Sequence, residues 1–210
     1  MSKDTWMSTR RAEYAQATRD AILDAARSLF ESQGYFGTRV EDIARAARVA
    51  PATVYAVGGG KSGLIREMIG TATTSDENRE IVARIDTFEE PRELIRFMVD
   101  RTAAKFEDWS PLMRQVVAAA PQEPTVRDAL HTAQASLRTG LNRVARRLAE
   151  LGAVQDADAA ADVLWFFLCN SSYFTLIDEL NWPLSRARDW LAATLETTLI
   201  GRVPGPTSGG

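Results

Sequence analysis

The chain has 210 residues, of which 45% are hydrophobic and 25% charged. This balance is ordinary for a soluble globular protein of one or two domains with a proper core. The formal net charge of −3 argues against a DNA partner, but the charge is unevenly distributed. Residues 1–70 carry ten Lys and Arg against eight Asp and Glu, whereas residues 71–210 carry fifteen against twenty. The N-terminal third therefore has the sign of charge that favours contact with phosphates.

One cysteine and one histidine limit the chemistry of the chain. A single Cys169 excludes an intrachain disulfide and argues against a cysteine-based zinc site, and its apolar neighbours predict a buried structural thiol. His131 has no second histidine or cysteine with which to share a metal. No Ser–His–Asp set is present either. We therefore expect no metal, no cofactor and no enzymatic activity.

Two absences bear on the compartment. The N-terminus lacks an apolar run that could direct export, and no segment reaches the roughly 18 uninterrupted apolar residues that span a bilayer. We expect a reduced, cytoplasmic protein.

The most specific pattern runs from Thr38 to Leu64. Thr38-x-x-Glu41 has the spacing of a capping box, which predicts that a helix begins there. Apolar residues then recur at helical spacing, at Val40, Ile43, Ala44 and Ala47. Arg48-Val49 makes a tight turn, and Pro51 falls where the first residue of a second helix belongs. A helix pair with such a short turn is typical of a helix-turn-helix, whose second helix enters the major groove of DNA.

The segment Gly58-Gly59-Gly60-Lys61-Ser62 allows three interpretations. A phosphate-binding P-loop needs a glycine or alanine at position 55 after a buried strand, but Tyr55 stands there and the preceding residues are helical. We favour Gly60 as the cap of a further helix, with Lys61 in its first turn, where ammonium and free N–H groups meet a DNA phosphate. A solvated Lys61 on a flexible turn is the alternative.

Proline and glycine divide the rest of the chain into helices. We expect a helix from Lys61 to about Asp76, a break at 87–91, and a helix from Pro91 that ends before a new one at Ser110-Pro111. After an interruption at 121–124, a long helix runs from Thr125 to Leu151 and Gly152 caps it. An apolar helix from Ala157 to about Leu180 and a last helix capped by Ser185 follow. No strand pattern or repeat occurs, so the prediction is an all-α fold of about nine helices.

About 50 residues of this chain resemble the TetR family of one-component transcriptional regulators. The matches are Arg19 to Phe30, Gly34-Tyr35, Thr38, Ile43-Ala44, Val49, Thr53, Tyr55, Lys61 and Leu64-Ile65. The departures gather around the second helix. Arg48 stands where the family commonly has glycine, and Ala50 where it has a serine cap. At residues 56–60 the family usually has an aromatic residue or histidine, a phenylalanine and a polar cap, whereas this chain has Ala56-Val57 and three glycines. This departure predicts an unusual backbone after the recognition helix.

The resemblance implies a DNA-binding domain at 1–62, a helical effector-binding and dimerisation domain at 63–202, and a disordered tail at 203–210. It implies that residues at the helix-turn-helix touch palindromic operator DNA. The predicted DNA-binding residues are Thr38, Arg39, Glu41, Arg48, Pro51, Ala52, Thr53, Tyr55 and Lys61.

The resemblance also implies a pocket for a small molecule among the middle helices. Aromatic and methionine residues with a few polar groups are typical of such pockets, although each of these side chains would serve equally as core. The candidate pocket residues are Phe97, Met98, Arg101, Phe106, Trp109, Met113, Trp165, Asn170 and Tyr173.

The last two predicted helices carry more apolar surface than a monomer of this size can bury. Pairing with a second copy in a four-helix bundle, as the family does, would cover it; intramolecular core is the alternative. The predicted dimer residues are Phe166, Phe167, Phe174, Trp190, Leu191, Leu195 and Leu199.

Together these features predict a homodimeric repressor that a small-molecule effector releases from its operator. The departures around residue 58 keep a second interpretation open, a helical ligand-binding adaptor whose DNA binding is weakened or lost. Without membrane segments, the expected partners are double-stranded DNA, a second copy of the chain and an unidentified effector.

Overall fold

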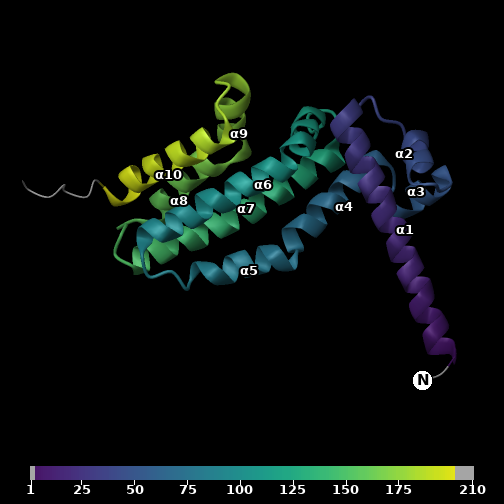
Figure 1. The fold of residues 1–210 in the computed structure, drawn as a ribbon, viewed down its shortest axis with the longest axis horizontal. Helices are drawn as coiled ribbons and strands as arrows, with labels where there is room; N and C mark the ends of the chain where they lie inside the picture. The colour runs from purple at the N-terminus through teal and green to yellow at the C-terminus, as the bar shows by residue number, and fades with distance from the viewer. Residues whose placement is uncertain (1–2, 202–210) are drawn as a thin grey trace, which may run out of the picture. The chain divides into compact units, whose positions relative to one another are not determined.

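A computed structural model describes residues 3–201, with side chains from residue 10, and every regular element in this range is helical (Figure 1). The all-α prediction is confirmed. The elements are α1 (Lys3–Gln33), α2 (Val40–Ala46), α3 (Pro51–Gly58), α4 (Lys61–Thr74), α5 (Asp76–Ile85), α6 (Pro91–Ala119), α7 (Pro124–Glu150), α8 (Ala157–Leu168), α9 (Asn170–Phe174), the π-helical segment η1 (Thr175–Glu179) and α10 (Leu184–Ile200). The predicted tail at 203–210 lies outside the described residues.

The chain folds as two compact units. The first, which we call the head, contains the residues up to Thr73 together with Pro111–Ala133; the second, the body, contains Thr74–Ser110 and the residues from Gln134 on. This division differs from the boundary expected at residue 62, because α4 and the adjoining ends of α6 and α7 belong to the head.

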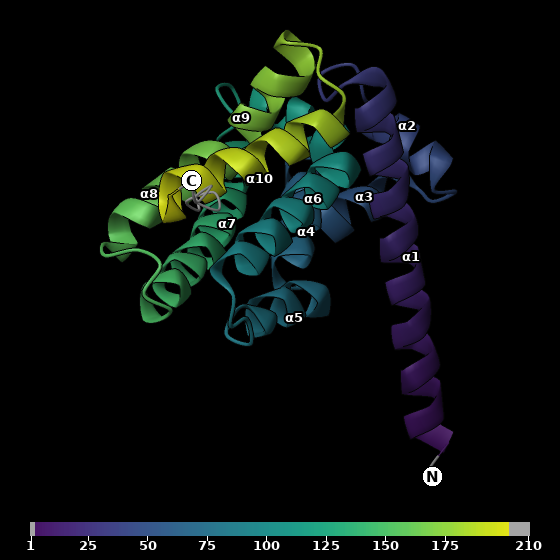
Figure 2. The same ribbon diagram turned by 60° about the vertical axis from the view of Figure 1, so that its left-hand side comes forward.

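The head contains the first four helices, α1 to α4 (Figure 2), and their apolar faces form its core. In α1, Ile22, Ala26 and Phe30 are fully buried at a spacing of four residues, which places them on one face. The other helices add their own buried residues: Val40, Ile43 and Ala44 from α2, Val54 from α3, and Leu64, Ile65, Met68 and Ile69 from α4. This core fixes α2 and α3 against α1 and α4.

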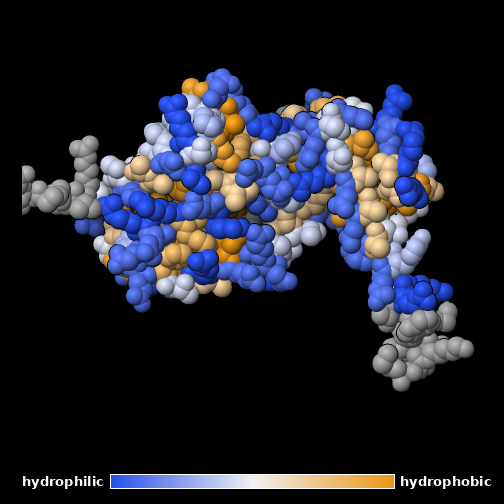
Figure 3. Space-filling model, viewed as in Figure 1, coloured by the Kyte–Doolittle hydropathy of each residue, from blue (hydrophilic) through white to orange (hydrophobic). Residues whose placement is uncertain are grey.

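The body has one continuous core between its long helices. Leu94, Ile95 and Val99 of α6 meet Leu141, Val144 and Leu148 of α7 there, and α8, α9 and α10 complete it. Figure 3 shows that apolar residues, in orange, also reach the surface of the molecule among the blue polar ones. Some of the apolar area of the body therefore stays uncovered in the single chain.

Two predicted helix boundaries are wrong. Pro111 does not begin a new helix but lies inside α6. Leu112, Met113 and Val116 just after it are buried, and their packing outweighs the hydrogen bond that a proline removes. The helix predicted from Ala157 to Leu180 is divided at Cys169, whose ψ of 161° is extended.

The segment Ala157–Glu179 has the length and mean hydropathy, 1.3, of a membrane-crossing helix. In the structure it comprises α8, α9 and η1 rather than one straight helix, and α8 packs against α10. Core helices of soluble proteins share this composition, and 33% of its apolar window is buried within the chain, so the segment is weak evidence for a membrane span.

Candidate nucleic-acid interface

The turn between α2 and α3 is four residues long. The α2 helix ends when Ala47 N–H donates to Ile43 O over 2.9 Å, and Val49 N–H then donates to Ala44 O over 2.9 Å. Between them Arg48 adopts φ +57°, the left-handed conformation that a helix needs in order to turn back sharply. Val54 of α3 is fully buried behind this turn. The predicted helix-turn-helix geometry is present.

Glycine at position 48 should stabilise the head. Arg48 holds a positive φ that costs an L-residue about 1 kcal/mol and costs glycine little. We expect Arg48→Gly to raise the free energy of unfolding by about 0.5–1 kcal/mol, measured by urea denaturation. Arg48→Ala, which removes the charge but keeps a Cβ, is the matched control and should give no such gain.

The predicted capping box at the start of α2 is wrong. The N-cap is Arg39, and no side chain caps it. The Thr38 hydroxyl instead donates to Gly34 O over 2.8 Å, and the Thr38 N–H donates to the same carbonyl over 3.2 Å. Because Thr38 is buried and both of its donors are used, it closes the loop after α1 rather than offering groups to a phosphate.

The exposed face of α3 is small and mostly without charge. Pro51 stands at the start of the helix, as predicted, and Ala50 before it makes no side-chain cap. Pro51, Ala52 and Ala56 are exposed, Thr53 is half-buried, and Tyr55 is 54% exposed. This face therefore offers methyl and methylene groups and two hydroxyls, those of Thr53 and Tyr55, to a partner.

Exposed charged side chains lie at the start of α2 and in the turn before α3. Arg39 and Glu41 at the start of α2 and Arg48 in the turn are exposed or partly exposed. Arg45 is also exposed but forms an ion pair with Asp42 over 2.9 Å. Solvent-exposed pairs of this kind are weak, so Arg45 can exchange its partner for a phosphate.

Lys61 starts α4, as predicted, but its ammonium is engaged within the head. Its Nζ donates to Tyr35 O over 2.7 Å and lies 4.4 Å from the centre of the Tyr35 ring. Burial lowers the pKa of Lys61, and Glu123 opposes that shift. The predicted phosphate contact of Lys61 would have to compete with these interactions.

Glycines shape the exit from α3. Gly59 caps the helix with φ +70° and donates its N–H to Tyr55 O. A Cβ on Gly58 would lie 2.4 Å from Leu64 Cδ2, and one on Gly63 only 1.5 Å from Gly58 O. The α3 and α4 helices therefore touch backbone to backbone, an approach that only glycine permits. The unusual sequence at 58–60 produces close packing rather than a loose connection.

Four of the nine predicted pocket residues lie in the core, and the other five are partly buried. In the body, Phe106 stacks on Tyr173 with ring centres 4.9 Å apart, and Phe174 lies 5.5 Å from Phe106. Met98 is buried in the body, whereas Met113 is buried in the head. The others engage neighbours near the surface: Phe97 packs on Phe88, Trp109 lies under Lys105, Trp165 lies under Arg138, Arg101 pairs with Glu77, and Asn170 begins α9.

Tyr173 links α9 to α6 through its hydroxyl, which lies 2.9 Å from that of Thr102. Burial raises the pKa of Tyr173 to about 12. Because the folded pKa exceeds the unfolded value of about 10, Tyr173 stabilises the fold below pH 10, and this contribution is lost as the pH rises to 12.

We therefore expect Tyr173→Phe to lower the free energy of unfolding by about 1 kcal/mol at pH 7. Between pH 10 and 12 the free energy of unfolding of the natural chain should fall, and that of the variant should fall by about 2–3 kcal/mol less. Urea unfolding across this range measures both effects. An equal alkaline loss in the two proteins would contradict the assignment.

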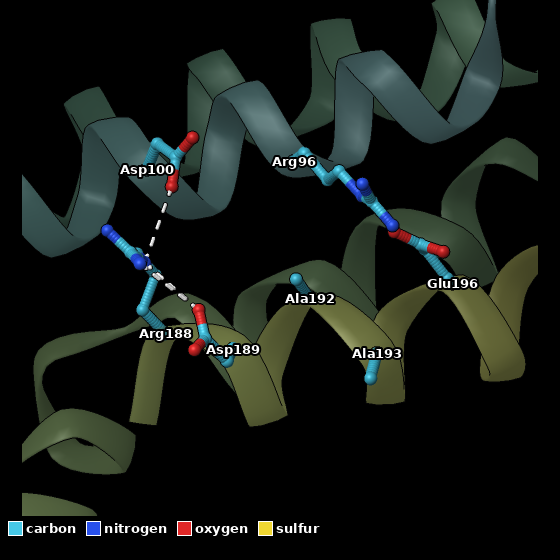
Figure 4. Close-up of a pocket in the computed structure, with 7 residues that line it drawn as sticks. All are labelled: Arg96, Asp100, Arg188, Asp189, Ala192, Ala193 and Glu196. Carbon is cyan, nitrogen blue, oxygen red and sulfur yellow. Dashed lines mark hydrogen bonds and ion pairs between the residues drawn. The ribbon is translucent and has the colours of Figure 1, made fainter. Parts of the chain in front are cut away.

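A groove of about 470 Å³ lies between α6 and α10 of the body, and none of the predicted pocket residues lines it. Figure 4 shows Arg96 and Glu196 meeting across it, with Ala192 and Ala193 along α10. Arg96 Nε donates to Glu196 Oε1 over 2.6 Å. The groove is lined by Arg96, Asp100, Arg188, Asp189, Ala192, Ala193 and Glu196. Its charges offset one another, so it offers little net attraction to an ionic ligand.

The predicted dimer residues fall into two groups. Leu191 and Leu195 are fully buried in the chain's own core, so their prediction as interface residues is wrong. Phe166 is 69% exposed and Trp190 is 41% exposed. Phe167 joins them, with its ring 5.2 Å from that of Phe166 and 6.1 Å from that of Trp190. Phe174 and Leu199 are partly buried. An aromatic face thus remains open on α8 and α10.

Sequence reasoning missed Gln115 and Glu123, which contact the loop after α1. Gln115 Oε1 accepts from Tyr35 N–H over 3.2 Å, and the pKa of Tyr35 is raised by burial and then by the Glu123 carboxylate. These contacts join residues 80 or more positions apart, and no local pattern at the glutamine or the glutamate could have indicated them.

Comparison with known proteins identifies the helix-turn-helix. Residues 22–68 match the family described as "Bacterial regulatory proteins, tetR family". No curated protein matches the sequence. Among solved structures, a SmeT–triclosan complex is 18% identical with a TM-score of 0.71, covering 92% of this chain and 98% of that one.

Two further structures share the fold. The fatty acid degradation regulator FadR from Bacillus halodurans is 17% identical with a TM-score of 0.71, covering 88% of this chain and 97% of its own. The TetR family regulator PfmR from Thermus thermophilus is 24% identical with a TM-score of 0.63, covering 89% of this chain and 98% of its own. At these identities the likeness establishes the fold alone.

Proposed function

We propose that the chain belongs to the tetR family of bacterial regulatory proteins, whose model matches residues 22–68, and that it is a homodimeric repressor released from operator DNA by a small molecule. It is a DNA-binding transcriptional regulator that acts in the cytoplasm. The observation that carries the proposal is the exposed face of α3, held on a rigid helix-turn-helix with Arg39 and Arg48 beside it.

Phosphates and bases are read by different parts of this surface. Arg39, Arg48 and the Tyr55 hydroxyl hold phosphates and fix the register on the duplex. Thr53 donates to or accepts from a base edge, and Pro51 and Ala52 pack on a thymine methyl. Glu41 accepts from a cytosine amine. Because α3 offers few hydrogen bonds, DNA shape supplies part of the specificity.

Dimerisation uses the aromatic face of Phe166, Phe167 and Trp190. Large exposed aromatic side chains that touch one another are typical of interface centres. A two-fold dimer built on this face would present two copies of α3 to successive turns of the major groove, about 34–36 Å apart.

The effector is an aromatic or largely apolar small molecule that binds in the body. The clustered rings of Phe106, Tyr173 and Phe174 support this chemistry, and the similar SmeT structure is a complex with triclosan. The effector lowers operator affinity only to the extent that it binds the DNA-free conformation of the protein more tightly than the DNA-bound conformation. Native mass spectrometry of the protein as purified identifies a co-purified effector.

Titration against DNA from the region upstream of its own gene, over a series of salt concentrations, tests the function. We expect site-selective binding whose log K falls linearly with log salt concentration, because bound phosphates release counterions. The double variant Arg39→Gln/Arg48→Gln should reduce the slope by about 2 while the protein stays folded. A helical adaptor without DNA-binding activity would show no selective binding, and that result would refute the repressor.

A further inference from the structure

Tyr35 is the centre of a polar cluster in the head. Its ring and backbone are buried, with only 2% of the residue exposed. Its N–H donates to Gln115 Oε1 over 3.2 Å, and its carbonyl accepts from Lys61 Nζ over 2.7 Å. Burial raises the pKa of its hydroxyl to about 12, and the Glu123 carboxylate adds to that rise. The backbone N–H and the carbonyl of Tyr35 are thus both held by side chains from distant parts of the sequence.

These partners come from two segments of the head. Lys61 and Ser62 form the first turn of α4, whereas Gln115 is in α6 and Glu123 precedes α7. Gly34 beside Tyr35 has φ +78°, and a Cβ there would lie 3.2 Å from Gln115 Oε1. The loop after α1 thus closes tightly against α6 and binds the start of α4 at the same time.

The start of α4 in turn determines where α3 lies. Gly63 and Gly58 are in backbone contact, and only Gly59 and Gly60 separate the two helices. Any displacement of the first turn of α4 must therefore move the end of α3 or break this contact. Because α3 carries the exposed face that reads DNA, the Tyr35 cluster acts on it through α4.

We propose that the cluster of Tyr35, Lys61, Gln115 and Glu123 holds the recognition helix in its DNA-reading position, so that Lys61 and Glu123 are positioning residues rather than phosphate contacts. The inference rests on the proposed function. Glu123 balances the Lys61 ammonium that lies against the Tyr35 ring.

The test compares Lys61→Met and Glu123→Gln in the salt titration with DNA from the region upstream of the protein's own gene. Each variant should weaken binding about fivefold to tenfold, the effect of a lost hydrogen bond to a charged group. The slope of log K against log salt should stay unchanged, because no phosphate contact is lost. The double variant should be no weaker than the weaker single one, since both remove the same link.

Asp128→Asn, an exposed carboxylate in the same unit, is the control and should bind as the natural chain does. Tyr35→Phe keeps the ring and removes only the hydroxyl, so it should reproduce the Glu123→Gln loss with the fold intact, as circular dichroism checks. A slope reduced by about 0.9 in Lys61→Met would show a phosphate contact and overturn the proposal, as would additive effects in the double variant. If the natural chain binds no DNA selectively at any salt concentration, the proposed function fails first and this inference with it.

Discussion

Alanine at Gly63 is expected to abolish DNA binding. A Cβ at this position would lie 1.5 Å from the carbonyl oxygen of Gly58 and 2.8 Å from its carbon. Both are backbone atoms, so no side-chain rotation relieves the clash, and α3 must separate from α4. Overpacking of this severity costs about 3 kcal/mol or more. We expect the head to unfold at lower urea concentration and operator affinity to fall at least about 100-fold, the equivalent of that free energy.

The matched control is Gly70→Ala in the same helix. A Cβ at Gly70 meets no atom within 4 Å, and alanine favours a helix by about 1 kcal/mol over glycine. This variant should therefore be as stable as the natural chain or slightly more so, with unchanged DNA affinity. Gly63→Ala with full affinity would show that α3 does not depend on its contact with α4.

Glutamate at Phe166 is expected to dissociate the dimer. Phe166 is the most exposed of the aromatic residues on α8 and α10, and it contacts Phe167. A carboxylate in the middle of an apolar interface would lose its hydration without gaining a partner, which costs several kcal/mol. Light scattering should give the 23.1 kDa of one chain, where the natural protein gives twice that mass.

Tyr14→Glu serves as the control for the dimer, because Tyr14 is a comparably exposed aromatic on α1. It should leave the mass of the assembly unchanged. The proposed interface is refuted if Phe166→Glu remains dimeric, or if the natural chain is itself a monomer. Loss of the dimer should also weaken operator binding, because two linked heads bind a palindrome far more tightly than one.

The parts of the fold that the sequence predicted correctly are those with local causes. Pro51 begins α3 because its fixed φ suits a first helical position, and Gly152 follows the end of α7 with φ +71°. Arg48 was recognised as a departure at the turn, and the structure gives it the left-handed conformation that glycine commonly supplies. Proline and glycine also marked the ends of the other long helices, except that Pro111 lies inside α6.

The errors arise where distant contacts decide. Thr38 is the local exception: it has the spacing of a capping box, but its hydroxyl donates to Gly34 O, four residues earlier in the chain. Leu191 and Leu195 lie on an apolar face of a helix, and such a face does not indicate whether it packs against the same chain or against another. Lys61 was predicted at the surface of a helix end, whereas its ammonium lies against Tyr35.

Footprinting of the protein on DNA from the region upstream of its own gene tests the central claim most directly. If α3 of each copy enters the major groove, two protected patches should appear on one face of the duplex, their centres about 10 base pairs or a multiple of that apart. Protection should disappear with Arg39→Gln/Arg48→Gln at moderate salt. A single patch, or uniform protection without sequence preference, would contradict a two-fold dimer that binds DNA through α3.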